Sequence, residues 1–326
     1  MMTQASRAFR RILAVTNGRD DDPALETAFA LARRSGACVV VLRCLEPPRD
    51  LKVLSSLTDR TPEELVKAQC EAERARLSKS AAFAAHGGEV GIDVAVGKAF
   101  IEIIRRAVAL EIDLVIKGAE PLPAPRRFLF ASTDQHLLRK CPCPVWLQTA
   151  QAPPRPSRVL ACVDVDVWDA AEPDTLRALN RKVIDTARLI AAPDGGEVIA
   201  LHAWDAAGEG ALWAFGGGVE ARALADAYVN EVRLARDKAM HELVSEYEGD
   251  DSSSPPVTPR LARGAPETII RSQAEALGAD VAVIGTVART GLGGVIIGNT
   301  AENIINSISM PVLALKPDGF VCPLDL

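Results

Sequence analysis

The chain has 326 residues, 48% of them hydrophobic and 25% charged, and its net charge at pH 7 is −6. This composition is that of a globular protein and excludes collagen-like, fibrous and intrinsically disordered chains. At roughly 150 residues per domain the length indicates two domains, and the acidic balance argues against a nucleic-acid binder, which would carry a basic face.

Targeting segments and disulfides are not expected either. No apolar run approaches the roughly 18–20 residues that a membrane-spanning helix requires. The arginines near the N-terminus are followed by only four apolar residues, 12–15, which is too short for the core of a signal peptide. Seven cysteines spread over a long chain do not form a disulfide framework. We therefore expect a reduced, cytoplasmic protein without a membrane partner.

Strand and helix patterns alternate through the first half of the chain. Short apolar or β-branched runs predict strands at residues 12–15, 38–42, 92–96, 113–117 and 144–147. Apolar residues at helical spacing and end signals predict helices at residues 23–35, 61–85, 100–110 and 132–139. Thr61 and Glu64 form a capping box around Pro62, which fixes the start of the second helix.

The second half of the chain repeats the first. The strand that begins at Arg11 is matched by one that begins at Arg158, 147 positions later, and the segment from Gly97 is matched by one from Gly264, 167 positions later. The prolines between the copies, Pro153, Pro154 and Pro156, indicate an extended linker. We therefore predict two domains, residues 1–150 and 151–326, each an α/β fold with helices on both faces of an open parallel sheet.

The most informative loop covers residues 285–294 and leads to a helix that begins near Asn299. Its small residues let backbone amides approach an anion, the helix start supplies a positive end, and Arg289 adds a charge for phosphate. The same residues also suit a flexible loop before a capped helix, because Asn299 and Glu302 form a capping box. No Gly-Lys-Ser/Thr follows the glycines, and Ile296 stands where a dinucleotide fingerprint has glycine.

These features together resemble the universal stress protein family. The resemblance rests on Asp164 at the end of a strand, on Gly264-Ala265-Pro266 before a helix, and on the segment 285–302. Two copies in one chain, with Asn299-Thr300-Ala301-Glu302 in the second, resemble the tandem E-type subgroup of that family. The resemblance covers residues 10–316 and implies two five-stranded parallel sheets of strand order 3-2-1-4-5, related by a pseudo-twofold.

The resemblance also implies a nucleotide site. In the nucleotide-binding branch of the family, an aspartate after the first strand and a residue after the second contact adenine, and the pattern Gly-x2-Gly-x9-Gly-Ser/Thr holds the phosphates. In the second copy the matching candidates are Asp164, Ala203, Gly285, Thr286, Arg289, Gly298, Asn299 and Thr300. The second glycine is replaced by Ala288 and the Ser/Thr by Asn299, which weakens the expected phosphate site.

The first copy departs further from the pattern. Asn17 replaces the aspartate, and Pro121 and Ala131 replace the second and third glycines. Proline removes an amide that an anion would need. We therefore expect a structural first copy and a ligand site in the second.

Several other signals have ordinary structural explanations. Trp204, Trp213 and Phe215 around residues 216–218 are compatible with an apolar ligand pocket, but also with a surface loop. The thiols of the sequence 141–144, Cys-Pro-Cys-Pro, are expected to pack as small apolar groups. We expect His202 to be a satisfied polar residue, and the acidic runs 20–22 and 248–251 to be solvated loop charge. The pair Asp164 and Asp166 alone is weak evidence of Mg²⁺.

Two classes of function follow. The first is a non-catalytic stress-response protein that binds a small-molecule ligand or a protein partner through the second copy. The alternative is an ATP-binding switch with slow ATP hydrolysis, in which Mg²⁺ accompanies ATP or another adenine nucleotide. The departures at Ala288 and Asn299 favour the first class, and no catalytic residues are predicted. In the family that the chain resembles, single-domain members form dimers through their last strands. The resemblance therefore implies that the last strands of the two copies pair as an intramolecular pseudo-dimer, which also covers both sheet edges, and a further homodimer stays open.

Overall fold

The computed structural model describes residues 9–48, 50–80, 83, 86, 90–120, 132–193, 195–214, 219–249, 254–286, 298–307 and 309–325, with the backbone alone for 213–214 and 299–300. The chain divides into two compact units. Unit 1 comprises Met1–Arg155, Gly293–Ile297 and Ser309–Leu326, and unit 2 comprises Pro156–Leu292 and Gly298–Ile308. The predicted domain boundary at residue 150 stays a prediction.

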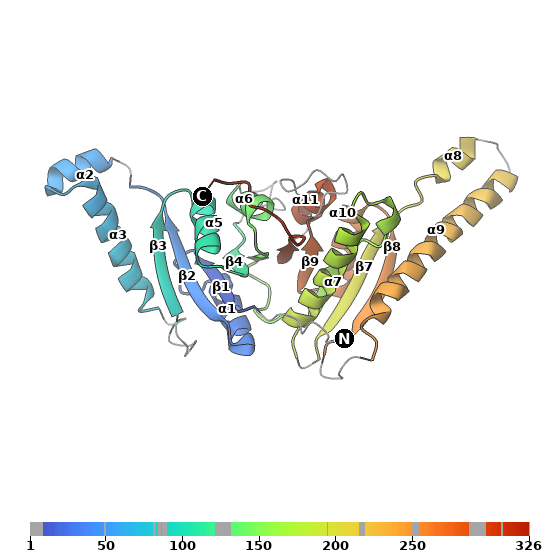
Figure 1. The fold of residues 1–326 in the computed structure, drawn as a ribbon, viewed down its shortest axis with the longest axis horizontal. Helices are drawn as coiled ribbons and strands as arrows, with labels where there is room; N and C mark the ends of the chain where they lie inside the picture. Colours follow the sequence, from blue (N-terminus) through green and yellow to red (C-terminus); the bar gives the residue numbers. More distant parts are fainter. Residues whose placement is uncertain are drawn as a thin grey trace. The chain divides into compact units, whose positions relative to one another are not determined.

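Unit 1 is an α/β unit. Its strands are β1 (Arg11–Thr16), β2 (Cys38–Leu45), β3 (Val90–Val96), β4 (Leu114–Gly118), β5 (Val145–Gln148) and β10 (Val312–Leu315). Its helices are α1 (Pro23–Ser35), α2 (Leu51–Thr58), α3 (Pro62–Leu77), α5 (Ala99–Ala109) and α6 (Ser132–Lys140). Figure 1 shows α3 running beside β3 at one edge of this unit.

The strands of unit 1 follow the order β3-β2-β1-β4-β5-β10. The first five are parallel, and β10 is antiparallel to β5, with Leu313 opposite Trp146. This confirms the expected pairing of the last strands of the two copies. The pairing gives β5 a partner on its outer side and so removes an exposed sheet edge.

Unit 2 repeats the architecture. Its strands are β6 (Arg158–Cys162), β7 (Glu197–Trp204), β8 (Val257–Arg263) and β9 (Val281–Gly285). Its helices are the 3-10 turn η1 (Val167–Asp169), α7 (Pro173–Ile190), α8 (Glu209–Ala214), α9 (Val219–Ser245), α10 (Pro266–Leu277) and α11 (Asn299–Ser307). The order β9-β6-β7-β8 is that of the first four strands of unit 1, and all pairs are parallel.

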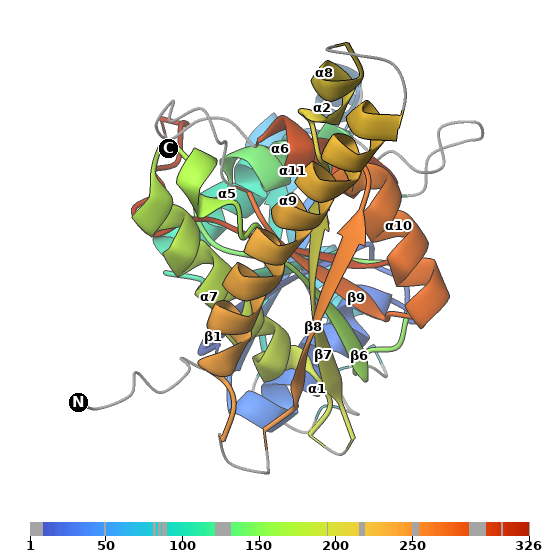
Figure 2. The ribbon, with the colours of Figure 1, turned by 90° about the vertical axis from the view of Figure 1, so that its right-hand side faces the viewer.

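Helices cover both faces of the parallel sheet in unit 2. Figure 2 shows α7 and α9 on one face of β6, β7 and β8, with α10 on the opposite face. The two central strands, β6 and β9, therefore have no exposed position and, apart from Arg158, consist of apolar residues that are mostly buried. This confirms the predicted fold class, an α/β fold with mostly parallel sheets in two tandem copies. The pseudo-twofold between the copies stays a prediction.

The structure corrects two predictions about the first copy and adds one helix. Helix α3 ends at Leu77, where Ser78 is its C-cap, and does not run unbroken to residue 85. Helix α2 was not predicted, because its eight residues bury no side chain and have no side-chain cap. Asp22 is not a solvated loop charge: it is buried, and it caps α1 by accepting a hydrogen bond from the backbone N–H of Ala24.

Candidate functional site

The carboxyl ends of β6, β7 and β9 lie at one edge of the sheet in unit 2. Cys162, the last residue of β6, is opposite Leu201 of β7 and Ile284 of β9. The residues that follow these positions, Asp164 and Gly285 among them, therefore share this edge. Ligands of open parallel sheets bind at such an edge, where the strand order reverses.

Hydrogen bonds from Asn180 of α7 to the backbone of Asp164 hold this residue at the edge. Its N–H donates to Oδ1 of Asn180 on α7 (3.0 Å), and Nδ2 of Asn180 donates to the Asp164 carbonyl (2.7 Å). The Asp164 side chain keeps 29% of its surface exposed. The fold thus fixes the main chain of Asp164 while its carboxylate reaches solvent.

Asp166 lies two residues further and points inward. Its N–H donates to Oδ1 of Asp164 (3.1 Å), and its side chain is buried against Arg236 of α9. Nη2 of Arg236 donates to Oδ2 of Asp166 (3.0 Å), and Nε lies 2.9 Å from Oδ1. The guanidinium carbon also lies 5.6 Å and 5.9 Å from the ring centroids of Trp168 and Trp204, within cation–π range.

His202 on β7 completes a cluster with the two aspartates. Its side chain is 3% exposed, with Nδ1 3.2 Å from the carbonyl oxygen of Val163 and Nε2 3.7 Å from Oδ1 of Asp166. Nε2 has no hydrogen-bond partner among the described residues, so the prediction of a satisfied polar residue holds for Nδ1 and not for Nε2. Burial lowers the pKa of His202 below its usual value, and the charges of Asp164 and Asp166 oppose this shift.

Two of the predicted ligand residues, Ala203 and Gly285, lie in strands. Ala203 lies in β7 opposite Ala262 of β8 and is half-buried. Gly285 ends β9, and a Cβ there would come within 2.6 Å of Leu179 Cδ2 on α7, so close helix–strand packing already requires glycine at this position. The sequence did not reveal this second reason for Gly285.

The remaining candidates follow β9. Thr286 and Gly298 are buried. Asn299 and Thr300 are the first two residues of α11. Ala288 and Arg289 lie outside the described residues, as do Phe215, residues 216–218, Pro121 and Ala131, so the predicted phosphate loop stays a prediction.

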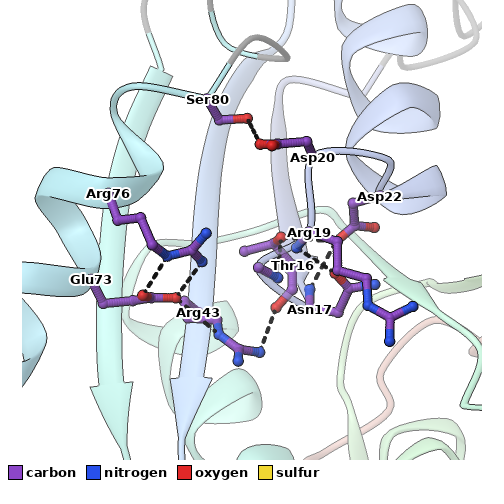
Figure 3. A network of polar contacts seen from close by, with 10 residues as sticks. Thr16, Asn17, Arg19, Asp20, Asp22, Arg43, Glu73, Arg76 and Ser80 are labelled. Carbon is purple, nitrogen blue, oxygen red and sulfur yellow. Dashed lines mark hydrogen bonds and ion pairs between the residues drawn. The ribbon is translucent and has the colours of Figure 1, made fainter.

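The corresponding edge of unit 1 is filled by the protein's own ion pairs (Figure 3). Nη1 of Arg43 lies 3.4 Å from the Thr16 carbonyl, and its Nε lies 3.4 Å from Oε1 of Glu73 on α3. Arg76 donates two hydrogen bonds to the same carboxylate, at 2.7 and 2.8 Å. A Cβ at Gly18, directly after Asn17, would meet Nη2 of Arg76 at 2.7 Å. These side chains therefore lie beside Gly18, while Asn17 itself is exposed.

A second ion pair within unit 1 lies at the N-terminus of α6, where free backbone N–H groups could otherwise bind an anion. Nζ of Lys117 on β4 is 2.9 Å from Oδ1 of Asp134, in the first turn of α6, and the Asp134 side chain is fully buried. The N–H of Glu120 donates to the other carboxylate oxygen (3.1 Å). The second copy has Ile284 and Ala301 at the positions of Lys117 and Asp134. The positive end of α6 is thus already neutralised from within.

The thiols of the Cys-Pro-Cys-Pro sequence are packed in the interior, as the sequence predicts. Cys141 and Cys143 are buried, with their sulfurs 3.6 Å apart, and all seven cysteines are free thiols. None of the described helices combines the length and the apolar character that a membrane crossing requires.

Comparison with known proteins decides the family. The model of the Universal stress protein family matches residues 8–148 and 157–316, which is both copies. The chain belongs to the universal stress protein family. Universal stress protein E of Salmonella typhi is 29% identical over 97% of this chain and 96% of its own length.

Solved structures agree with this universal stress protein assignment. A protein of unknown function from Pseudomonas aeruginosa PAO1 is 26% identical, with a TM-score of 0.67 over 97% of this chain and 95% of its own. A universal stress protein from Archaeoglobus fulgidus, 16% identical, shares the fold with a TM-score of 0.59 over 96% of this chain and 99% of its own. The near-complete coverage supports a tandem protein of the E type.

Proposed function

We propose that this universal stress protein is a non-catalytic, cytoplasmic stress-response protein. It binds a small molecule at the edge of unit 2 where the carboxyl ends of β6, β7 and β9 lie. The observation that carries the proposal is the asymmetry between the two copies. Unit 2 presents the carboxylate of Asp164 from a fixed backbone, whereas unit 1 has the amide of Asn17 there, with Arg43, Glu73 and Arg76 beside the next residue, Gly18. A ligand at the edge of unit 1 would have to displace these side chains.

The chemistry of the edge favours a ligand that donates hydrogen bonds. A carboxylate such as that of Asp164 accepts from an exocyclic amine or a ring N–H, and adenine supplies the former. The sequence pattern around Gly285 and Gly298 makes an adenine nucleotide the first compound to test, although Ala288 and Asn299 depart from it. The alternative, a switch that hydrolyses ATP slowly, uses the same edge. It differs from a simple binding protein in that it releases phosphate from ATP.

Calorimetric titration of the full-length protein with ATP and Mg²⁺ tests the proposal. We expect one site per chain, and we expect Asp164→Ala to weaken binding by roughly tenfold to 100-fold, because a hydrogen bond to a charged group contributes about 1.5–3 kcal/mol. Asn17→Ala is the matched control in the first copy and should bind like the parent protein. Phosphate release at the rate of a protein-free blank is expected for a non-catalytic protein.

Two results would count against this proposal. One is ATP binding that Asn17→Ala weakens and Asp164→Ala leaves intact. The other is a parent protein that binds no ATP and whose native mass spectrum shows no co-purified small molecule. A co-purified mass that disappears in Asp164→Ala would support the site with another ligand, and ATP turnover that disappears in the same variant would support the switch.

A further inference from the structure

Asp164, Asp166 and His202 bring three ligand-type atoms together at the edge of unit 2. These atoms, one from each side chain, all lie within 4.8 Å of one another, and no other group in the described part of the chain meets this criterion. Two of the side chains, those of Asp166 and His202, are buried. Carboxylates with an imidazole are a donor set that proteins use for divalent metals.

The surroundings of His202 indicate which of its nitrogens is the ligand. Nδ1 is 3.2 Å from the carbonyl oxygen of Val163, and the N–H of Val165 is directed at the same nitrogen (3.4 Å), so Nε2 is the nitrogen open to a ligand. A metal ion on Nε2 requires the tautomer with Nδ1–H, which keeps the shorter contact to the Val163 carbonyl and gives up the longer contact with the Val165 N–H. Metal-binding histidines have this arrangement, because the carbonyl fixes both the tautomer and the ring orientation.

The lone pair on Nε2 is placed for a cation. Nε2 is buried, has no hydrogen-bond partner among the described residues, and lies 3.7 Å from Oδ1 of Asp166. A lone pair that faces a carboxylate oxygen is repelled by it, and a buried polar atom without a partner costs free energy. A metal ion between the two atoms would give Nε2 its partner and would share Oδ1 of Asp166 with Nε of Arg236.

The charges of the cluster also suit a divalent ion. With a neutral imidazole, the two aspartates and Arg236 leave one net negative charge at a partly buried site. Arg236 holds Asp166 through both carboxylate oxygens, with Nη2 3.0 Å from Oδ2 and Nε 2.9 Å from Oδ1, and its guanidinium lies beside Trp168 and Trp204. It therefore fixes the orientation of the carboxylate.

We propose that Asp164, Asp166 and His202 bind one divalent transition-metal ion of the Zn²⁺ class. One nitrogen and two oxygen ligands leave a fourth position for water or for a ligand atom, as in zinc sites with an open position. The nitrogen ligand favours Zn²⁺ or Co²⁺ over Mg²⁺, which prefers oxygen. The site needs no nucleotide and so does not depend on the function proposed above.

The first copy supplies an internal contrast. The repeat places Asn17, Arg19 and Arg43 where the second copy has Asp164, Asp166 and His202. Two arginines in place of an aspartate and a histidine repel a cation. The proposal therefore requires one site per chain.

The test is titration of the full-length, nucleotide-free protein with Co²⁺, followed by visible absorbance and by displacement with Zn²⁺. We expect one Co²⁺ per chain, with d–d bands and without the thiolate charge-transfer band that cysteine ligands would add. His202→Gln should weaken binding by roughly 100-fold or more, since even the loss of an outer hydrogen-bond partner of a ligand costs 10–100-fold. His241→Gln is the matched control: its Nδ1 is also 3.7 Å from an aspartate oxygen, that of Asp237, but it is exposed.

A second variant keeps the proposal testable if His202→Gln does not fold. Asp164→Asn preserves shape and can still accept the hydrogen bond from the Asp166 N–H, so the loop is retained while the charged ligand is lost. It should also weaken Co²⁺ binding by at least about tenfold. The proposal fails if the parent protein shows no saturable binding, if a thiolate band appears, or if both variants bind Co²⁺ like His241→Gln.

Discussion

Lys316 is a buried cation at the end of β10. Its ammonium donates to the carbonyl of Leu138 and lies 4.7 Å from the centroid of the Phe320 ring. Burial lowers the pKa of Lys316 from 10.5 to about 8, and the neighbouring Cys141 opposes the shift. The folded protein therefore loses this proton at a lower pH than the unfolded chain does.

This difference predicts how stability depends on pH. Between pH 8 and 10.5 the unfolded chain binds more protons than the folded protein, so Lys316 makes the free energy of unfolding rise with pH, by up to about 1.4 kcal/mol per pH unit. Lys316→Met should remove this rise. Urea unfolding of both proteins at several pH values measures it, with Lys238→Met, whose side chain is 80% exposed, as the control. Parallel curves for the parent protein and Lys316→Met would contradict the prediction.

At this scale the sequence predicted residue positions better than residue roles. Asp164 is a fixed carboxylate at the sheet edge, as its place after a strand indicated. Asp22 looked like one of three solvated acids, but it also accepts hydrogen bonds from Thr16 Oγ1 and the Asn17 N–H. The sequence does not distinguish a cap from a solvated charge when three acids are adjacent, because only the fold decides which of them turns inward.

At the scale of elements, a buried ion pair joins β4 to α6. Lys117 and Asp134 have each other as close charge partners, with Glu120 completing the group. Removal of one partner leaves a buried charge uncompensated, whereas replacement of both with apolar residues is often tolerated. The second copy shows such a replacement, since Ile284 and Ala301 stand at the two positions.

We therefore predict a non-additive pair of substitutions. Lys117→Ile alone should lower the free energy of unfolding by about 3–5 kcal/mol, because it leaves Asp134 buried without its cation. Adding Asp134→Ala, which completes the residues of the second copy, should restore part of that loss. Denaturant unfolding of the singles and the double measures the coupling. Additive effects would show that the pair does not stabilise the fold as a unit.

The ends of elements were less predictable than their existence. The strands and α1 follow from β-branched runs and from caps, and α1 spans the predicted residues. Helix α3 starts at its predicted capping box but ends at Leu77. The helical pattern continues toward the glycines at 87 and 88 without a strong stop signal, so the sequence alone does not place the end.

At the scale of the whole molecule, one strand of the second copy completes the sheet of unit 1. Strand β10 belongs to the second copy in sequence but to unit 1 in space, where it pairs with β5. The resemblance to a family whose single-domain members dimerise through their last strands predicted this pairing. A cut at the linker would therefore remove a strand from unit 1, and for that reason the experiments above use the full-length chain.

The candidate site was only partly predictable from the sequence, because its residues come from distant segments of the chain. The repeat and the resemblance identified Asp164, but Arg236 lies 70 residues beyond Asp166 in a helix without a recognisable motif. His202 likewise reaches the aspartates only because β7 pairs beside β6. Contacts between distant segments are properties of the fold, and a single sequence does not record them.

A crystal structure of the full-length protein with its co-purified ligand or with ATP would locate the ligand in one copy or the other. We predict ligand density beside Asp164 in unit 2, with the contacts of Arg43 and Arg76 to Glu73 intact in unit 1. Ligand density beside Asn17, with those contacts broken and the edge near Asp164 closed, would contradict it.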